Sequence, residues 1–303
     1  MDNLEIIESL KQDMPDTVAV IGYGSGIYKQ TGYSPEEKPD KDVIVVVDDF
    51  KDFLIEDFEK NPKHFSDDFD KHILLRKKEK EKFYSNVGCL KFYHDNIHFK
   101  AMVISKKALE DDMNTWKYFG MAGRLTKPIL YQNIPDKLEE AIQTNREKIL
   151  ITALLLNPND KLTPNELYNT ISRLTYMYDF RTIVPGEKKS KSEDIVNGAY
   201  DFFEKTYGQS DIISINNGII HNPHPIEQIY FLPDNLKKYI IKSLTRYDFD
   251  RESIQKISKA VNNYFRKTNF PNSIRLALSS STTLGKKETI KHGLSKVKRH
   301  FQR

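Results

Sequence analysis

Three glycines lie within five residues in the segment Gly22-Tyr23-Gly24-Ser25-Gly26. Glycine allows a sharp turn and a close approach of the backbone to a ligand, and successive N–H groups in such a turn can point at an anion. Ser25 adds a hydroxyl donor. These residues favour a phosphate-binding turn, although an ordinary tight turn can have the same composition.

Two carboxylates follow this turn. Asp42 lies sixteen residues after Gly26, and Asp40 precedes it by two. Residues two apart in a strand point to one face, about 6 to 7 Å from each other. Mg²⁺ prefers one or two carboxylates together with substrate phosphates, so we expect Asp42 and Asp40 to bind magnesium beside the turn. Asp48 lies about 20 Å further along a straight strand and is expected to end the strand or cap a helix.

A sheet is needed to position the turn and the acidic pair. Residues 17–21 are apolar and lead into the turn, and residues 42–47 form a β-branched run typical of a strand buried on both faces. These elements indicate an α/β unit, in which helices cover the sheet. The remaining predicted elements are strands at 88–93 and 98–104 and helices at 4–10, 50–59 and 106–116.

The chain becomes mainly helical after about residue 135. Apolar residues recur at helical spacing from residue 136, residues 163–166 (Thr-Pro-Asn-Glu) are typical of a helix start, and residues 248–265 are amphipathic. Residues 184–194 are polar and rich in lysine, which predicts a mobile loop. We expect three units, at 1–135, 136–245 and 246–303.

The order of these features indicates a reaction class. A strand, then a Gly-x-Gly-Ser-Gly turn, then an acidic strand resembles the layout of the nucleotidyltransferases of the DNA polymerase beta superfamily. Magnesium in such a site stabilises the charge on the phosphoryl group that is transferred. The prediction is a metal-dependent nucleotidyltransferase with an α/β (α+β) catalytic domain.

Composition excludes several classes of protein. The longest apolar runs of the 303 residues fall far short of the roughly 20 residues that cross a bilayer. The single cysteine, Cys89, cannot form an internal disulfide, which predicts a reducing compartment. The first residues are acidic and lack the features of a signal or transit peptide. We therefore expect a cytoplasmic protein, or a mature form, without a transmembrane segment.

Six longer segments follow one another along the chain: GYGSGIYKQ (22–30), DVIVVVDD (42–49), NPKHFS (61–66), FGMAGRLTKPI (119–129), DFRTIV (179–184) and IRLALS (274–279). In this order they resemble the mitochondrial phosphatidate cytidylyltransferase family, the CDP-diacylglycerol synthases also called translocator assembly and maintenance proteins. The resemblance implies a nucleotidyltransferase domain, a winged-helix-like domain and a C-terminal segment that contacts a membrane, here in a bacterial member. It also implies that CTP and phosphatidic acid react to give CDP-diacylglycerol and pyrophosphate.

The resemblance also suggests roles for basic residues. Lys100 matches a strand lysine that could meet the triphosphate, and Arg124 and Lys127 are suited to binding phosphate. Arg181 and Lys191, which flank the predicted loop, could close over the nucleotide or the lipid headgroup. The structural alternatives are solvated lysines and, for Arg124, a helix cap.

Some positions depart from the family pattern. Leu54 and Asp57 replace a histidine and an asparagine that are usual there, and Asp40 stands where the family is generally apolar. The metal role of Asp40 therefore depends on spacing alone. His64 and Ser66 match the family, but a lone histidine is more often a structural hydrogen-bonding group than a catalyst.

The end of the chain is basic and amphipathic. Residues 285–303 contain seven Lys or Arg and one Glu, and the apolar residues 290, 294, 297 and 301 recur at helical spacing. Such a helix suits an anionic bilayer surface, where each basic residue contributes about 1 kcal/mol. Docking on the protein's own core and binding of nucleic acid are the alternatives. The expected lipid contacts are Lys291, Lys296, Lys298 and Arg299.

Taken together, these patterns predict a magnesium-dependent cytidylyltransferase that binds CTP and phosphatidic acid at the inner face of a bacterial membrane. A nucleic-acid partner is not expected. One alternative keeps the fold and the metal but uses a soluble sugar phosphate or an RNA end as the acceptor. Another is a non-catalytic interaction protein at the membrane, against which the presence of Asp42 argues.

Overall fold

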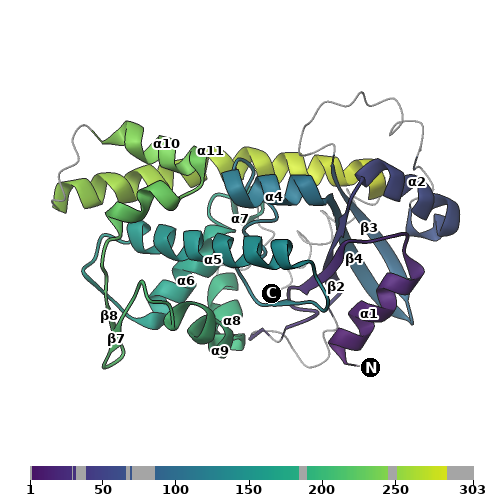
Figure 1. Cartoon of the computed structure of the whole chain (residues 1–303), viewed down its shortest axis with the longest axis horizontal. Coiled ribbons are helices and arrows are strands. Elements are labelled where there is room, and N and C mark those ends of the chain that lie inside the picture. The colour runs from purple at the N-terminus through teal and green to yellow at the C-terminus, as the bar shows by residue number, and fades with distance from the viewer. Residues whose placement is uncertain are drawn as a thin grey trace.

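A computed structural model describes residues 2–28, 30–31, 39–65, 69, 86–183, 190–244 and 251–284. The main sheet lies at one end of the molecule, and a bundle of helices extends from it to the other end (Figure 1). Helix α11 (Arg251–Leu284) runs along both parts. This is the mixed α/β architecture that the sequence predicted, with a mixed sheet.

The main sheet has five strands in the order β3-β4-β2-β1-β5. Strands β2 and β4 are parallel, and the other neighbouring strands are antiparallel. The first strand lies two residues later than predicted, so that its end reaches the glycine turn. The strands are β1 (Ala19–Tyr23), β2 (Lys41–Val47), β3 (Val87–His94), β4 (Ile97–Ser105) and β5 (Ile129–Leu130).

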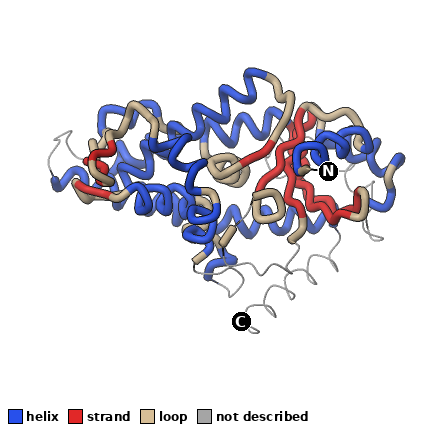
Figure 2. Tube along the Cα trace, turned by 90° about the horizontal axis from the view of Figure 1, so that it is seen from below, coloured by secondary structure: helices blue, strands red, loops and turns tan. Residues whose placement is uncertain are grey.

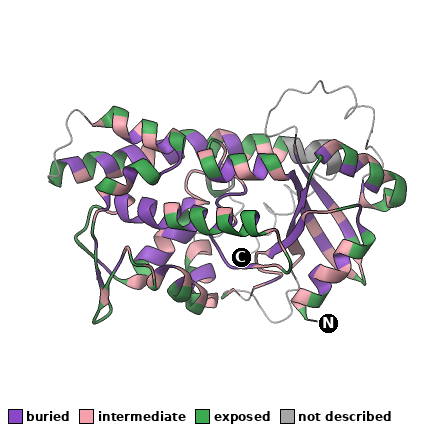
Figure 3. Ribbon diagram, viewed as in Figure 1, coloured by how far each residue is buried: buried purple, intermediate pink, exposed green. Residues whose placement is uncertain are grey.

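Each face of this sheet belongs to a different hydrophobic cluster, because side chains alternate along a strand. Val43 and Val45 of β2 pack with helices α1 (Asn3–Asp13) and α2 (Phe50–Lys60). Ile44 and Val46 pack on the other face, together with α4 (Lys106–Thr115) and α5 (Asp136–Leu156). Strand β2 is buried on both faces, as its β-branched run predicted (Figure 3).

A two-residue turn fixes the pairing of β3 with β4. Asp95 and Asn96 have φ angles of 48° and 61°, as a type I′ hairpin turn requires. The turn pairs His94 with Ile97, and continued antiparallel pairing places Lys91 opposite Lys100. The turn sequence therefore decides which side chains lie next to each other at the centre of the hairpin.

The second part of the chain is mainly helical and carries a small sheet of order β6-β8-β7 at the end far from the main sheet (Figure 2). Its residues share one hydrophobic cluster with the main sheet, which joins Ile44 to Leu167 and Phe265. Its elements are β6 (Lys161–Leu162), α6 (Pro164–Leu174), α7 (Phe180–Ile183), α8 (Lys191–Gly198), α9 (Tyr200–Phe203), η3 (Glu204–Gly208), β7 (Ile215–Asn216), β8 (Ile219–His221), η4 (Ile226–Phe231) and α10 (Asp234–Ser243).

The structure decides two details that the sequence left open. Asp48 directly follows the last residue of β2 and is exposed, so of its two expected roles it ends the strand. The residue that caps α2 is Asp49, whose carboxylate accepts hydrogen bonds from the N–H groups of Lys51 (2.8 Å) and Asp52 (3.0 Å). Residues 251–265 of the amphipathic pattern predicted at 248–265 belong to the longer helix α11, and residues 248–250 lie outside the described residues. No helix in the described ranges is long and apolar enough to cross a membrane.

Candidate functional site

The glycine turn and the acidic strand lie side by side. Tyr23 pairs with Asp42 at the end of β1, and Gly24 follows with a φ of 77°. A methyl group on the Gly24 Cα would lie 2.9 Å from Asp42 Oδ2, and one on Gly26 would lie 2.3 Å from the Asp40 carbonyl oxygen. Only glycine fits at these two positions, because a side chain would push the turn away from the acidic strand.

Four polar side chains continue in register across the sheet from this turn. Tyr23 pairs with Asp42, Asp42 with Lys100, and Lys100 with Lys91. Directly paired residues point to the same face of a sheet. We call Tyr23, Asp42, Lys100 and Lys91 the polar row. It places a carboxylate between a glycine turn and two ammonium groups.

Arg124 is held against the polar row by Tyr23. The Tyr23 hydroxyl is buried and hydrogen-bonds to the Arg124 side chain. Burial raises the pKa of this hydroxyl, the charge of Asp42 raises it further, and the charge of Arg124 lowers it. The Arg124 guanidinium also donates to the Gly120 carbonyl. These bonds hold the Arg124 guanidinium, a group suited to binding phosphate, close to Asp42.

The buried Cys89 thiol lies on the same face of β3 as Lys91, and its pKa is affected by charged side chains of the site. Burial raises its pKa to about 11. The charges of Lys100, Lys91 and Arg124 lower it, and the charge of Asp42 raises it. The thiol is protonated at neutral pH and inert. The charges that act on this thiol are therefore those of the polar row and of Arg124.

Asp40 lies beside the turn, but its carboxylate has a partner of its own. Asp40 Oδ1 is 2.6 Å from His98 Nδ1, one pleat beyond Lys100 on β4. Asp42, in contact with the turn, is the better-placed ligand for a cation that also binds phosphates. Among the described residues no group of three or more His, Cys, Asp or Glu could hold a metal. A magnesium ion at Asp42 would therefore have to take most of its other ligands from substrate phosphates and water.

Two residues support the turn from the opposite face. Lys41 Nζ donates to the Gly26 carbonyl (3.1 Å) and to Asn3 Oδ1 (2.5 Å), and Asn3 Nδ2 donates to the Ile27 carbonyl (2.8 Å). Burial lowers the pKa of the Lys41 ammonium. The N–H groups of the same two peptides, those of Ile27 and Tyr28, donate to the Gly24 carbonyl (3.2 and 2.9 Å), so these bonds fix the backbone on both sides of the turn's last peptides. The sequence analysis did not find Asn3 and Lys41, because their role depends on the packing of α1.

Buried polar groups fix the segment that carries Arg124. Asp112 accepts hydrogen bonds from the N–H groups of Met121 (2.8 Å) and Ala122 (3.0 Å), and Asn145 donates to the Ala122 carbonyl (2.9 Å). Arg146 donates to the Leu125 carbonyl (3.2 Å). The segment 119–127 is therefore a rigid loop between the sheet and the helices.

Lys127, at the end of this segment, contacts the helical part. Its side chain is buried, with Nζ 3.3 Å from the Tyr176 hydroxyl and 4.4 Å from the centre of the Tyr176 ring. The ammonium is thus oriented by a cation–π contact. Its expected contact with nucleotide stays a prediction.

The helical part reaches the chain just after the glycine turn. The Thr31 N–H donates to the Asp194 carbonyl (3.1 Å), so helix α8 lies next to this segment. Lys191 is the first residue of α8, three residues before Asp194, so the prediction of a loop at 184–194 is wrong for residues 191–194. Arg181 belongs to α7, and its side chain lies outside the described residues. The tail residues Lys291, Lys296, Lys298 and Arg299 also lie outside them.

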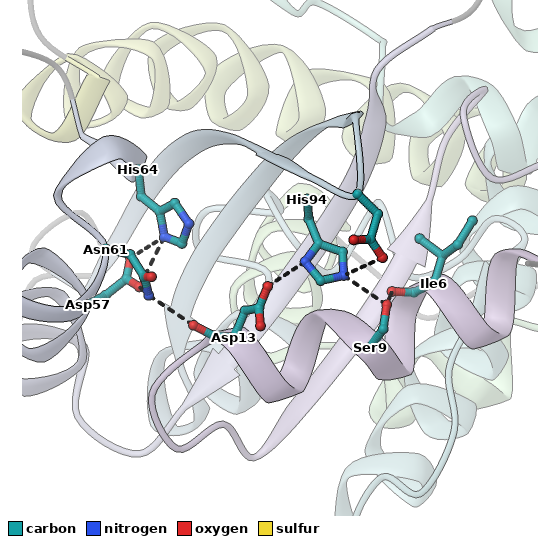
Figure 4. A network of polar contacts seen from close by, with 8 residues as sticks. Ile6, Ser9, Asp13, Asp57, Asn61, His64 and His94 are labelled. Carbon is teal, nitrogen blue, oxygen red and sulfur yellow. Dashed lines mark hydrogen bonds and ion pairs between the residues drawn. The ribbon is translucent and has the colours of Figure 1, made fainter.

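The face of the sheet that carries α1 and α2 has a separate polar network (Figure 4). His64 Nδ1 lies 2.9 Å from Asp57 Oδ2, and Asn61 Nδ2 donates to Asp57 Oδ1 (3.0 Å). The His64 ring also packs on Phe92, whose side chain belongs to the cluster of this face. His64 and Asp57 therefore join α2 to the sheet on the side away from the polar row.

His94 makes a second connection on this face. Its Nδ1 lies 2.6 Å from Asp13 Oδ2, and its Nε2 lies 2.9 Å from Ser9 Oγ (Figure 4). The order serine, histidine, aspartate is that of a nucleophile with its base. However, Ser9 Oγ donates its proton to the Ile6 carbonyl (2.9 Å). The arrangement joins α1 to the β3–β4 hairpin and does not activate Ser9.

Comparison with known proteins identifies the family. A sequence model described as "Phosphatidate cytidylyltransferase, mitochondrial" matches residues 4–223, which include the glycine turn, the polar row and the segment 119–127. The chain belongs to the mitochondrial phosphatidate cytidylyltransferase family. The match ends before α10 and α11, so these helices lie beyond the part of the chain that the family model describes.

Curated phosphatidate cytidylyltransferases confirm the assignment. The Schizosaccharomyces pombe protein is 29% identical over 215 residues, covering 66% of this chain and 53% of that protein. The Caenorhabditis briggsae protein is 34% identical over 199 residues (63% and 60%), and the human protein is 31% identical over 194 residues (61% and 42%). The chain thus spans about half the length of these relatives.

Two further results concern location and fold. The expected location at a bacterial cytoplasmic membrane is wrong, because the family and its matched relatives are named mitochondrial. A nucleotidyltransferase-like protein from Exiguobacterium sibiricum superposes with a TM-score of 0.27 and 9% identity, over 91% of this chain and 75% of that one. So loose a superposition carries no argument about the fold of this chain.

Proposed function

We propose that the protein is a CTP:phosphatidate cytidylyltransferase. The observation that carries the proposal is the contact of the glycine turn with Asp42, in register with Lys100, in a chain of this family. The reaction joins an oxygen of the acceptor phosphate to the α-phosphorus of CTP. The bond from that phosphorus to the β-phosphate oxygen breaks, and pyrophosphate leaves with the electron pair.

In this proposal the glycine turn, the polar row and Arg124 have different roles. The N–H groups of the glycine turn, with Ser25, bind the triphosphate, and Lys100 and Arg124 neutralise its charge. Asp42 holds Mg²⁺, which stabilises negative charge on the phosphates when it is bound. The acceptor phosphate is already ionised near neutral pH, so positioning and charge neutralisation can supply the acceleration without a general base.

The finer fold assignment is part of the same proposal. The order of β1, the glycine turn and β2 supports a nucleotidyltransferase domain of the DNA polymerase beta type. Helices α6 and α8, followed by the β7–β8 hairpin with its Asn217-Gly218 turn, support a winged-helix-like second domain. Phosphatidate lies in a bilayer, so we also propose peripheral membrane binding, with the basic residues after 285 as its contacts.

The test is incubation with labelled CTP, Mg²⁺ and vesicles that contain phosphatidate. We expect a labelled lipid with the wild-type protein, its loss with EDTA, and its loss with Asp42→Ala. Transfer to a sugar phosphate or an RNA end, without transfer to phosphatidate, would show that the enzyme uses another acceptor. Full biological activity of Asp42→Ala would instead indicate a non-catalytic protein.

A further inference from the structure

Lys91 lies opposite Lys100 on the neighbouring strand, at the outer end of the polar row. The two lysines are a directly paired position of β3 and β4, and both side chains are partly exposed. Like charges directly opposite each other in a sheet are destabilising. In the part of the chain that the structure describes, Lys91 forms no ion pair with a carboxylate. Two adjacent positive charges in a candidate active site suggest a dianionic ligand.

The order of groups across the sheet indicates which ligand this is. From β1 to β3, the order is glycine turn, Asp42, Lys100 and Lys91. In nucleotidyl transfer the attacking oxygen and the leaving pyrophosphate lie roughly in line, on opposite sides of the α-phosphorus. If the triphosphate lies on the turn, the acceptor approaches from the side of β4 and β3. Lys91 lies on that side, on β3.

We infer that Lys91, together with Lys100, binds the phosphate of the acceptor and makes the site specific for phosphate monoesters. A phosphate monoester carries between one and a half and two negative charges near pH 7, with a second pKa of about 6. It therefore matches two ammonium groups, whereas a phosphodiester carries a single charge. The inference rests on the proposed function and goes beyond it by assigning the acceptor subsite. The competing explanation is that Lys91 protects the edge strand β3 from pairing with another sheet.

Kinetics with a water-soluble acceptor test the inference without the effects of a membrane surface. With dihexanoyl phosphatidate, Lys91→Met should raise the KM for phosphatidate about 10-fold and leave the KM for CTP within about twofold. Lys91→Arg should retain most of the wild-type affinity. Lys137→Met, which removes the same charge from an exposed position of α5, should change neither constant. An unchanged KM for phosphatidate in Lys91→Met, or an equal rise in both constants, would overturn the inference.

Thermal unfolding with inorganic phosphate tests Lys91 independently of the reaction. Phosphate should raise the Tm of the wild-type protein more than that of Lys91→Met. Without phosphate the variant should be at least as stable as the wild type, because the repulsion between the lysines is gone. Equal stabilisation of both proteins would overturn the inference. If the wild type fails to use phosphatidate but shows the phosphate effect, the proposed reaction is wrong and the anion subsite stands.

Discussion

The two faces of the main sheet both carry charged side chains, but they use them differently. On the face of α1 and α2, the rings of His64 and His94 contact the carboxylates of Asp57 and Asp13, and each contact joins two elements of the fold. On the other face, the polar row and Arg124 gather around the glycine turn and the buried Cys89 thiol. We call the pairs His64–Asp57 and His94–Asp13 the histidine ties.

The difference shows why residue type alone does not locate a site. The arrangement around His94 has the composition of a catalytic triad, yet it joins a helix to a hairpin. Asp42 belongs to the site because it touches a turn that only glycine can form. We therefore expect substitutions in the polar row to affect activity and substitutions in the histidine ties to affect stability.

The largest loss of activity is expected from Gly24→Ala. A methyl group there meets Asp42 Oδ2 at 2.9 Å, and the φ of 77° adds strain of about 1 to 2 kcal/mol. Displacement of the carboxylate should lower the rate of lipid labelling about 100-fold. Gly218→Ala is a matched control, because Gly218 has a φ of 73° and open space around its Cα. Equal losses of activity in both variants would show that strain, and not contact with Asp42, is responsible.

A smaller loss is expected from Tyr23→Phe, which removes the hydrogen bond to Arg124. Loss of one bond to a charged group should lower kcat/KM for CTP about 10-fold. The control is Tyr264→Phe, which removes a buried hydroxyl bonded to the Trp116 carbonyl (2.6 Å) in the helical part. It should lower the Tm without a comparable loss of activity. If Tyr23→Phe changes only the Tm, Arg124 does not need this tyrosine for its position.

Lys41→Met should have a milder effect, because Lys41 acts on the turn from the opposite face. Loss of its bonds to Gly26 and Asn3 should raise the KM for CTP about fivefold, with a smaller change in kcat. Asn3→Ala should act in the same direction. Because both residues hold one turn, the double variant should lose less than the sum of the two single changes in free energy. A change in Tm without a change in the KM for CTP would show that Lys41 and Asn3 stabilise the fold but do not contribute to CTP binding.

The smallest effect on activity is expected from His64→Gln, on the other face. Loss of the contact with the buried Asp57 should lower the free energy of unfolding by about 1 to 3 kcal/mol. Below the Tm, kcat should remain within about twofold of the wild-type value. Chemical denaturation and steady-state kinetics measure the two effects separately. A large fall in kcat at unchanged stability would contradict the division between the two faces.

Local patterns predicted much of the fold, because they depend on residues near each other in the sequence. The β-branched run at 42–47 indicated a strand buried on both faces, and it is one. The turn at Asp95 and Asn96 could also have predicted the pairing of Lys91 with Lys100, because a two-residue turn fixes hairpin register. The sequence left open whether Asp48 ends the strand or caps a helix, and the cap of α2 is the next residue, Asp49, because the exact start of a helix depends on local backbone geometry.

The sequence by itself determined that a glycine turn precedes an acidic strand, and the order of its motifs indicated the family. Only the tertiary structure decided that Asp40 pairs with His98, that Asn3 and Lys41 hold the turn, and that His64 lies on the far face. These contacts join residues that are distant along the chain or lie on different elements. Their geometry depends on strand register and helix packing, which no local pattern of residue types specifies.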